Sequence, residues 1–579
     1  MEQKKKLELR IFSSLEKIFP EKKAPVYRPE CCLLTALRGE RVSFQVGFAP
    51  NVTERQEKDD RHYFARVEVD SALAEYVTVR EVVSVPNRYP CHLTYDDDYL
   101  RTEPGLYPDL LQELRGDCVV VNPARWGALW VDVYPDEQAP AGDFPVRIIF
   151  RDAQTGELLG EAVQTVTVCD ALLPAQTLIR TEWFHADCLA DYYHVPVFSE
   201  EHWRILENFI RCAAEHGINM LLTPVFTPPL DTKGGGERTT VQLVKVYGKQ
   251  DEKGKTHWCF DFSLLERWVK MCLSCGIRYF EISHLFTQWG AKSAPKVMAE
   301  MDGEKKRVLG WDTPAVGGAY TEFLRAFLPQ LLEALERLGV RQNSYFHISD
   351  EPAGEHLESY RAARESVADL LEGQVIMDAL SNYEFYEKGY VTQPICSSDH
   401  IQTFLDQGVK HVWSYYCTAQ SLEVSNRFLS MPSARNRAYG LQLFKFDIPG
   451  CLHWGFNFYN SMYSLWHVDP MADTCAGGMV PGGDPFLVYP GEDGRPMGSI
   501  RLMVFEEGLN DLRALQLLAK LIGKEETVAM LEEELSEGIT FSRYPRSDYY
   551  YISVRNRVNR RIACELEKRT AGDGQAAGD

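Results

Sequence analysis

From about residue 173 onward, apolar strand-like segments alternate with helical segments, and this alternation is the strongest constraint on the fold. Three amphipathic helical stretches stand out at residues 201–217, 262–276 and 319–339. Eight strand candidates can be counted, namely LIRTEWFHAD, INMLLTP, IRYFEISHL, SYFHISDEP, QVIMDALS, PICSSDH, KHVWSYYC and GCLHWGFN. Eight strand–helix units over roughly 340 residues predict a (β/α)8 TIM barrel with long loops. A doubly wound sheet usually has fewer strands and a glycine-rich phosphate turn.

Residues 26–172 have a different sequence pattern, because apolar and polar residues alternate there in short runs. RVSFQVGFAP, YVTVREVVSV and FPVRIIFRD are examples, and Pro, Gly and Asp separate the runs. Short strands at this spacing predict an antiparallel β-sandwich. The segment holds no cluster of catalytic residue types, so we expect it to brace the next domain, although ligand binding stays open.

The fold class expected for the whole chain is therefore multidomain, α/β plus all-β. A chain of 579 residues is too long for one compact core. We predict four parts: an N-terminal helical segment at 1–25, the β-sandwich at 26–172, the catalytic barrel at 173–523, and a C-terminal helical segment with a disordered tail at 524–579.

The charge balance restricts the partners. With 83 acidic and 62 basic residues the formal charge is -21, which argues against nucleic acid and anionic membranes. No apolar run approaches the ~20 residues of a membrane span, and the N-terminus lacks the unbroken apolar stretch of about 7–15 residues that a signal peptide needs. Fifteen cysteines among apolar neighbours suggest reduced thiols. We therefore expect a cytoplasmic protein.

The C-terminal ends of the strands carry the chemistry in barrels of this kind. The candidates there are aromatic rings, amides, histidines and carboxylates: His185, His284, Trp289, Asp378, Trp413, Tyr415, Trp454 and Asn457. Rings stack on the apolar faces of sugars while polar groups bind their hydroxyls, so the set favours a carbohydrate substrate. The histidines lack metal-ligand spacing and GGGER at 234–238 is not a phosphate loop, so we expect neither a metal nor a cofactor.

Asp350 and Glu351 stand side by side where the strand YFHIS runs into Pro352. By themselves these residues also fit an exposed turn, but their place at a barrel strand end favours catalysis. Pro352 is expected to hold Glu351 in extended geometry. Two carboxyls this close cannot both ionise easily, so one pKa should rise, and a protonated Glu is suited to general acid catalysis.

Adjacency also bears on the mechanism. A retaining glycosidase with its own nucleophile needs two carboxyls about 5–5.5 Å apart on opposite sides of the scissile bond, whereas sequence neighbours approach from one side. The segment KHVWSYYC, where a nucleophile is often found, has no carboxylate. Substrate-assisted catalysis fits better, with Asp350 orienting a 2-acetamido group and Glu351 acting as acid and then base. Tyr415 or Tyr416 would donate to the acetamido oxygen, and Trp454 would form a wall of the pocket.

Four motifs in order resemble glycoside hydrolase family 123 and the related domain-of-unknown-function family 4091. They are YFHISDEP, CLHWGFNFY, GGDPFLVYPG at 482–491 and SIRLMVFEEGLNDLRALQLL at 499–518. The resemblance covers nearly the whole chain. It implies a β-sandwich followed by a TIM barrel and the activity of a retaining, substrate-assisted β-N-acetylgalactosaminidase. The family's Asp-Glu pair maps onto Asp350 and Glu351, and HWGFN implies that Trp454 and Asn457 lie in the pocket.

The expected partner is a carbohydrate with a terminal β-linked N-acetylhexosamine, and a homo-oligomer is compatible with the sequence. Two alternatives stay open. One is a glycosidase for another sugar that uses Glu351 with a different carboxylate such as Asp378. The other is a non-catalytic carbohydrate-binding protein on a barrel scaffold. Galactosamine preference is implied by the resemblance, since no residue can be matched to the 4-hydroxyl.

Overall fold

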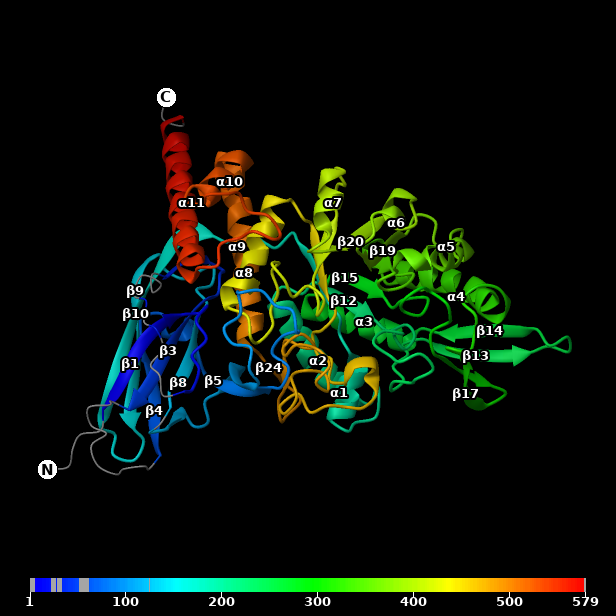
Figure 1. Ribbon diagram of the computed structural model, residues 1–579, viewed down its shortest axis with the longest axis horizontal. Helices are drawn as coiled ribbons and strands as arrows, with labels where there is room; N and C mark the ends of the chain where they lie inside the picture. Colours follow the sequence, from blue (N-terminus) through cyan, green and yellow to red (C-terminus); the bar gives the residue numbers. More distant parts are fainter. Residues whose placement is uncertain are drawn as a thin grey trace. The chain divides into compact units, whose positions relative to one another are not determined.

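The computed structural model describes residues 6–21, 26, 28, 34–50, 62–123 and 125–576, and Figure 1 shows its ribbon. The chain forms two compact units, each assembled from segments that are separate in sequence. The first, hereafter the sheet unit, combines residues 1–177, 421–447 and 497–579. The second, hereafter the barrel unit, combines residues 178–420 and 448–496.

Eight parallel strands close into a barrel in chain order, so the mixed α/β class and the strand count are confirmed. Each of the eight strand candidates overlaps one barrel strand. The strands are β11 (Ile179–Glu182), β12 (Met220–Thr223), β15 (Tyr279–Ile282), β18 (Ser344–Phe346), β19 (Val375–Leu380), β20 (Gln393–Ser397), β21 (Trp413–Tyr415) and β22 (Gly450–His453). β22 pairs with β11, which completes the closure. The C-terminal ends of all eight strands therefore meet at one rim.

Helices follow the barrel strands, and the three clearest ones begin and end within two residues of the predicted bounds. Ser199 caps one of them by accepting the His202 N–H, and Gly276 ends another in a left-handed conformation with φ of 104°. The helices of this unit are α1 (Ala186–Tyr192), α2 (Glu200–Glu215), α3 (Ser263–Cys275), α4 (Gly318–Arg337), α5 (Leu357–Ser366), α6 (Glu384–Glu387) and α7 (Ile401–Asp406).

The long connections after β12 and β15 are partly sheet. They contribute β13 (Lys245–Gln250), β14 (Thr256–Asp261), β16 (Val297–Met301) and β17 (Glu304–Leu309), which form a four-stranded sheet. The hairpin of β13 and β14 projects away from the barrel (Figure 1). A two-stranded sheet joins β23 (Tyr489–Pro490) to β24 (Pro496–Met497).

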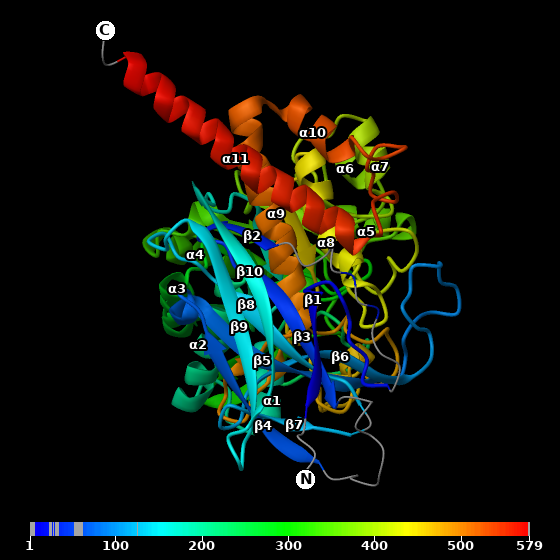
Figure 2. The same cartoon turned by 90° about the vertical axis from the view of Figure 1, so that its left-hand side faces the viewer.

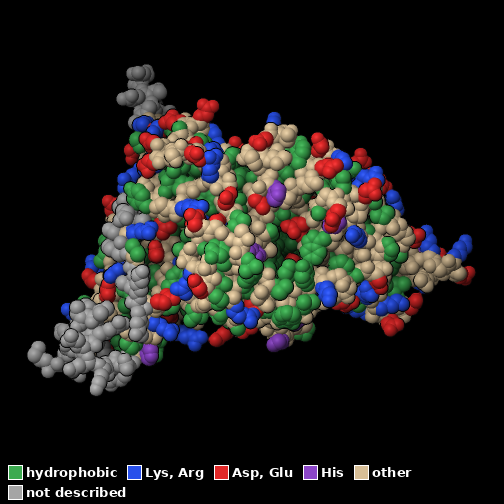
Figure 3. All heavy atoms as spheres, in the orientation of Figure 1, with side chains coloured by type: hydrophobic (Ala, Val, Ile, Leu, Met, Phe, Trp, Pro, Cys, Tyr) green, Lys and Arg blue, Asp and Glu red, His purple; other side chains and the backbone are tan. Residues whose placement is uncertain are grey.

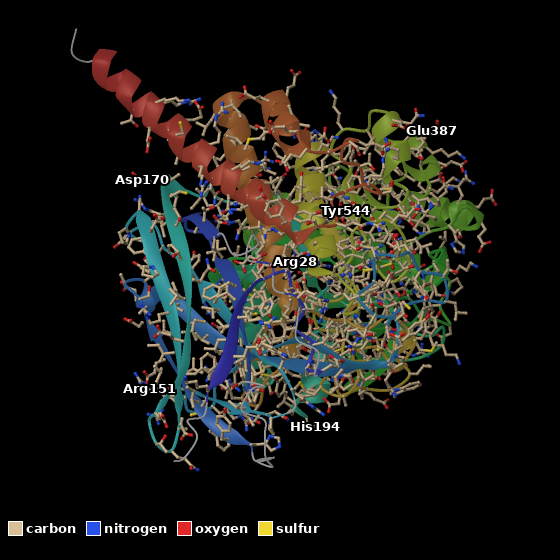
Figure 4. All side chains as sticks on the ribbon, turned by 60° about the vertical axis from the view of Figure 1, so that its left-hand side comes forward. Arg28, Arg151, Asp170, His194, Glu387 and Tyr544 are labelled. Atoms are coloured by element: carbon tan, nitrogen blue, oxygen red, sulfur yellow. The ribbon has the colours of Figure 1, made fainter. Side chains whose placement is uncertain are left out.

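Two five-stranded sheets make up most of the sheet unit (Figure 2). One contains β1 (Leu7–Ser13), β3 (Val42–Pro50), β8 (Gly127–Val133), β5 (Val77–Asn87) and β6 (Gly105–Glu113). The other contains β2 (Leu34–Arg38), β10 (Leu158–Leu172), β9 (Gly142–Asp152), β4 (Tyr63–Asp70) and β7 (Cys118–Val121), and its β2–β10 pairing is parallel. Phe44 and Val46 of the first sheet share one buried core with Val146 and Ile148 of the second. Arg151 and Asp170 mark opposite ends of the β9–β10 pair in Figure 4.

The predicted N-terminal helical segment at 1–25 is wrong where the structure describes it. Residues 7–13 form strand β1, which pairs antiparallel with β3. The physical reason is visible in LELRIFS, where Leu7, Leu9 and Ile11 alternate with Glu8 and Arg10. That period of two suits a strand with one face against a core, and the core contacts of these three residues agree.

Four helices of the C-terminal part belong to the sheet unit. They are α8 (Ser433–Lys445), α9 (Ile500–Ile522), α10 (Lys524–Glu532) and α11 (Asp548–Ala576). α9 packs on α8 and α11, so the barrel unit ends at Pro496 rather than at the predicted boundary of 523. The predicted disordered tail is helical as far as Ala576, and residues 577–579 lie outside the described residues.

The described residues contain no helix long and apolar enough to cross a membrane. On the face shown in Figure 3, acidic and basic side chains are interspersed over the surface.

Candidate active site

One pocket lies at the C-terminal rim of the barrel, and the space between its walls, with the solvent at its mouth included, is about 690 Å³. Its lining combines three carboxylates with aromatic, amide and apolar side chains: Trp183, Asp231, Gln288, Trp289, Asp350, Glu351, Ala379, Tyr415, Cys417, Thr418, Leu452, Trp454, Phe458, Met462 and Val480. We call Asp231, Asp350 and Glu351 the pocket cluster.

Asp350 is held in place by the loop that follows β15. The Gln288 side-chain amide donates to Asp350 Oδ2 at 2.7 Å, and the Trp289 backbone N–H donates to the Asp350 carbonyl at 3.2 Å. Only 4% of Asp350 is exposed. Burial, reinforced by the neighbouring charges of Glu351 and Asp231, raises the pKa of Asp350 well above its usual range.

Glu351 lines the same pocket because its backbone is left-handed, with φ of 42°. This corrects the extended geometry expected ahead of Pro352. Neighbouring side chains on an extended strand point to opposite faces, whereas the turn at Glu351 brings its carboxyl beside that of Asp350. The Tyr415 hydroxyl donates to Glu351 Oε1 at 2.9 Å. A non-glycine residue in this region stores strain that is characteristic of functional sites.

Burial raises the pKa of all three carboxyls of the pocket cluster. Burial raises the pKa of Glu351, while hydrogen bonds from Tyr415 and Trp289 act to lower it. Burial also raises the pKa of Asp231 to about 7; the nearby Arg238 charge opposes this rise, and the Glu351 charge adds to it. Three carboxyls with raised pKa values in one pocket suit proton transfer.

Trp454 lines one wall of the pocket and is held there by two contacts. Its indole Nε1 donates to Asp484 Oδ2 at 2.8 Å, and its ring meets Phe458 edge to face at a centroid distance of 5.0 Å. Asp484 is fully buried, and its other oxygen lies 3.3 Å from His453 Nε2. Trp289 stands at the mouth, 37% exposed, with its ring edge-on to Tyr463.

Of the candidate residues, Tyr415, Trp289 and Trp454 line the pocket, whereas His185 and Asn457 lie behind it. The Asn457 side chain accepts the His185 N–H at 2.8 Å and donates to the His185 carbonyl at 3.1 Å. The His185 ring lies 3.0 Å from the Trp454 carbonyl and 3.1 Å from Arg238 Nη2. These contacts join the ends of β11 and β22, so the two residues support the wall instead of lining the pocket.

Trp413 also lies away from the pocket, in the apolar core of the barrel, where 2% of it is exposed. Its ring packs against Tyr345 at a centroid distance of 5.8 Å. A Cβ at Gly450 would lie 2.2 Å from the Trp413 ring, so this close approach requires glycine there. Trp413 and Tyr415 share one face of β21, but only Tyr415 is near enough to the rim to meet a ligand.

Asp378 and His284 belong to a second, closed group inside the barrel. The His347 ring lies 2.8 Å from Asp378 Oδ1 through Nδ1 and 2.7 Å from Glu281 Oε1 through Nε2. We call Glu281, His347 and Asp378 the core cluster. All three side chains are fully buried, and the His284 ring stacks on that of His347 at a centroid distance of 4.0 Å.

The hydrogen bonds of the core cluster favour the protonated form of His347. Burial alone would lower the pKa of His347, but hydrogen bonds to Asp378 and Glu281 outweigh it and raise the pKa to about 9. Ligand atoms of His284, His347 and Asp378 lie within 4.8 Å of one another, the spacing of a metal site. Each ring nitrogen of His347 already lies within hydrogen-bond distance of a carboxylate oxygen, which is the arrangement of an internal hydrogen-bond network.

Asp231 and Asp484 are the site residues that sequence reasoning missed. Asp231 lies in the long loop after β12, and its backbone is left-handed with φ of 44°. Loop length was a usable signal, since long barrel-top loops are usually functional. Nothing in the sequence pairs Asp484 with Trp454, because that contact depends on how the loop after β22 folds back.

The comparisons with known proteins agree with this geometry. Residues 183–518 match the family model described as glycoside hydrolase 123, catalytic domain. The chain belongs to glycoside hydrolase family 123. It is therefore an enzyme that hydrolyses glycosidic bonds, and the expected resemblance is confirmed. No curated protein matches the sequence.

Solved structures resemble this family 123 hydrolase to different extents. A family 123 glycoside hydrolase from Clostridium perfringens, described for glycolipid glycan hydrolysis, shares 14% identity at a TM-score of 0.72, covering 98% of this chain and 100% of that one. This likeness supports the fold alone. β-Glucuronidases from Ruminococcus gnavus (9% identity, TM-score 0.31, 81% and 66% coverage) and Bacteroides uniformis (11%, 0.28, 79% and 48%) are far less similar.

Proposed function

We propose that this family 123 hydrolase is an exo-acting, retaining β-N-acetylgalactosaminidase that removes terminal β-linked N-acetylgalactosamine from glycans or glycolipids. The observation that carries the proposal is the placement of Asp350 and Glu351, sequence neighbours that line one pocket. The glycolipid glycan hydrolysis described for the Clostridium perfringens enzyme supports the substrate class. At the level of fold, we propose an N-terminal β-sandwich and a (β/α)8 catalytic barrel. The cytoplasmic location stays a prediction.

In the first step, the Glu351 carboxylic acid gives its proton to the glycosidic oxygen as the bond from that oxygen to C1 breaks. The 2-acetamido carbonyl oxygen of the substrate attacks C1 and closes an oxazolinium ring. The Asp350 carboxylate accepts the acetamido N–H and stabilises the positive charge. Gln288 holds Asp350 in position for this role through its 2.7 Å hydrogen bond.

In the second step, the Glu351 carboxylate takes a proton from water while the water oxygen attacks C1 and reopens the ring. Two displacements at C1 leave the β configuration unchanged. The Tyr415 hydroxyl donates to Glu351, and we propose that it turns to the acetamido oxygen of a bound substrate.

The alternative that uses Asp378 as the second carboxylate has little support. Asp378 is fully buried and accepts hydrogen bonds from His347, Tyr360 and the Ile348 N–H. A carboxylate in that position reaches neither the substrate nor a water molecule in the pocket.

The test is hydrolysis of 4-nitrophenyl β-N-acetylgalactosaminide, β-N-acetylglucosaminide and β-galactoside by the wild type and Glu351→Gln. We expect turnover of the acetamido sugars only, with kcat/KM reduced about 10²- to 10⁴-fold in the variant, the usual contribution of one general acid. Turnover of the plain galactoside would refute the substrate-assisted mechanism. Equal rates in the variant would remove Glu351 from catalysis.

A further inference from the structure

Asp231 lies in the pocket on a loop that is held from three sides. Its backbone N–H donates to Gln288 Oε1 at 2.7 Å, and the Ser464 hydroxyl donates to its carbonyl at 2.7 Å. One residue earlier, the Leu230 carbonyl accepts from Arg238 Nη1 at 3.0 Å. The left-handed φ of 44° at Asp231 is therefore fixed by tertiary contacts, and its carboxyl has a defined position.

The Asp231 carboxylate has no donor of its own among the residues that the structure describes. Every hydrogen bond of Asp231 involves its backbone. The nearby cation, Arg238, is already engaged: its guanidinium bonds both oxygens of Asp187 at 2.9 Å, the His185 ring at 3.1 Å and the Leu230 carbonyl. Asp231 is half-buried, so its carboxylate is open to the pocket, and in a ligand site the ligand commonly supplies the missing donor.

The other two members of the pocket cluster differ, because each has a side-chain donor. Asp350 accepts from Gln288, and Glu351 accepts from Tyr415. Gln288 links Asp231 to Asp350, because its Nε2 donates to the Asp350 carboxylate and its Oε1 accepts the backbone N–H of Asp231. A single side chain therefore bridges the Asp350 carboxylate and the backbone of Asp231.

An N-acetylhexosamine ring has donors to match this arrangement. If C1 and the 2-acetamido group meet Glu351 and Asp350, the remaining donors are the 3-, 4- and 6-hydroxyls on the other side of the ring. Trp454 and Phe458 supply the apolar walls, and the only pocket-lining carboxylate left for those hydroxyls, within the described part of the chain, is Asp231.

We infer that Asp231 is a specificity-determining residue that accepts a hydrogen bond from one ring hydroxyl of the terminal N-acetylhexosamine. This inference rests on the proposed function for the identity of the sugar. It assigns to Asp231 the recognition of the sugar ring and leaves the chemical step to Asp350 and Glu351.

The test is the binding of N-acetylgalactosamine, its 3-, 4- and 6-deoxy analogues, and N-acetylglucosamine, measured by calorimetry on the full chain. The variants are Asp231→Asn and, as a matched control, Asp302→Asn. Asp302 is also an aspartate with positive φ (53°), but it is exposed in the turn between β16 and β17. Asn tolerates left-handed backbone, so both substitutions should preserve the fold, which thermal unfolding will check.

We expect Asp231→Asn to weaken N-acetylgalactosamine binding about 10- to 100-fold, the usual value of a charge-assisted hydrogen bond, while Asp302→Asn leaves it unchanged. The one deoxy analogue that lacks the recognised hydroxyl should bind the wild type and Asp231→Asn alike. A general structural defect would instead weaken all the sugars equally, and that outcome would overturn the inference.

Hydrolysis, measured on the same proteins, keeps the two proposals distinguishable. Sugar binding without turnover of any acetamido glycoside would refute the proposed function and leave the role of Asp231 to be judged by the binding data. Absence of any monosaccharide binding by the wild type would overturn the inference. Unchanged binding in Asp231→Asn with turnover abolished would also overturn it, and would assign Asp231 to the chemical step.

Discussion

The core cluster and the pocket cluster contain similar residues inside one barrel, yet they are built differently. In the core cluster, the Glu281 oxygens accept from Trp183, Thr181 and His347, while Asp378 accepts from His347, Tyr360 and the backbone. In the pocket cluster, Asp350 accepts from the Gln288 side chain, Glu351 accepts from Tyr415 and Trp289, and Asp231 has only backbone hydrogen bonds. A satisfied network stabilises the fold, whereas an under-satisfied one is ready for a ligand. The hydrogen-bond donors available to each carboxylate therefore distinguish a structural cluster from a ligand-binding cluster better than the residue types do.

The largest expected effect comes from breaking the core cluster. His347→Gln removes the cation and leaves two buried carboxylates with reduced compensation, so we expect the free energy of unfolding to fall by about 3–5 kcal/mol. Urea denaturation at pH 7 measures it. The matched control is His257→Gln, whose ring forms a surface ion pair with Asp251 and is 64% exposed, so its loss should hardly matter. Equal effects of the two substitutions would contradict the comparison.

The free energy of unfolding should also depend on pH differently in His347→Gln and in the wild type. His347 has a folded-state pKa of about 9, above the ~6.5 of an unfolded histidine. Its contribution to stability is therefore complete below pH 6.5 and is lost as pH rises through 9, by about 3 kcal/mol. His347→Gln should lack this decline between pH 6.5 and 9. Other groups facing His347 are Glu281, Asp378, neutral His284 and Asp350, and they remain present in both proteins.

A smaller effect, on the pH–rate profile, is expected when Tyr415, the residue that donates to Glu351, is changed. Tyr415→Phe removes a hydrogen bond that lowers the pKa of Glu351. The alkaline limb of the pH–rate profile should therefore move to higher pH, by roughly one unit, and kcat/KM should fall about tenfold. A shift to lower pH, or none, would show that the hydroxyl does not control Glu351.

The smallest effect is expected on the free energy of unfolding when a carboxyl of the pocket cluster is removed. Glu351→Gln removes one of several crowded carboxyls, so thermal unfolding should show unchanged stability or a gain of about 0.5–1.5 kcal/mol, the usual trade-off at an active site. A loss as large as that of His347→Gln would mean that the pocket carboxylates are structural and would remove the distinction between the clusters.

The barrel and the place of Asp350 and Glu351 at its rim were predictable because each depends on a local pattern. Apolar runs mark the strands, and YFHISDEP places two carboxyls at a strand end. Only some of the predicted pocket residues line the pocket, because a sequence motif does not show how far along a strand the barrel core ends and the rim begins. Trp413 and Tyr415 are two residues apart on one strand, and only Tyr415 lines the pocket. The left-handed backbone at Glu351 and Asp231 depends on tertiary hydrogen bonds, so Pro352 alone suggested the wrong geometry.

The segmental make-up of the two units sets an order for their completion on the ribosome. The barrel unit is fully synthesised once residue 496 has been added, because its segments are 178–420 and 448–496. The sheet unit starts first but needs residues 497–579, including α9 and α11. Its β-strands must therefore wait, through the translation of more than 300 intervening residues at about 5–20 per second, for the helices that belong to the same unit. An expression fragment limited to residues 183–518 would contain α8 and most of α9 but lack the strands of the sheet unit and α11. The apolar faces that these two helices bury in the full chain would then be exposed, so we expect the fragment to express poorly.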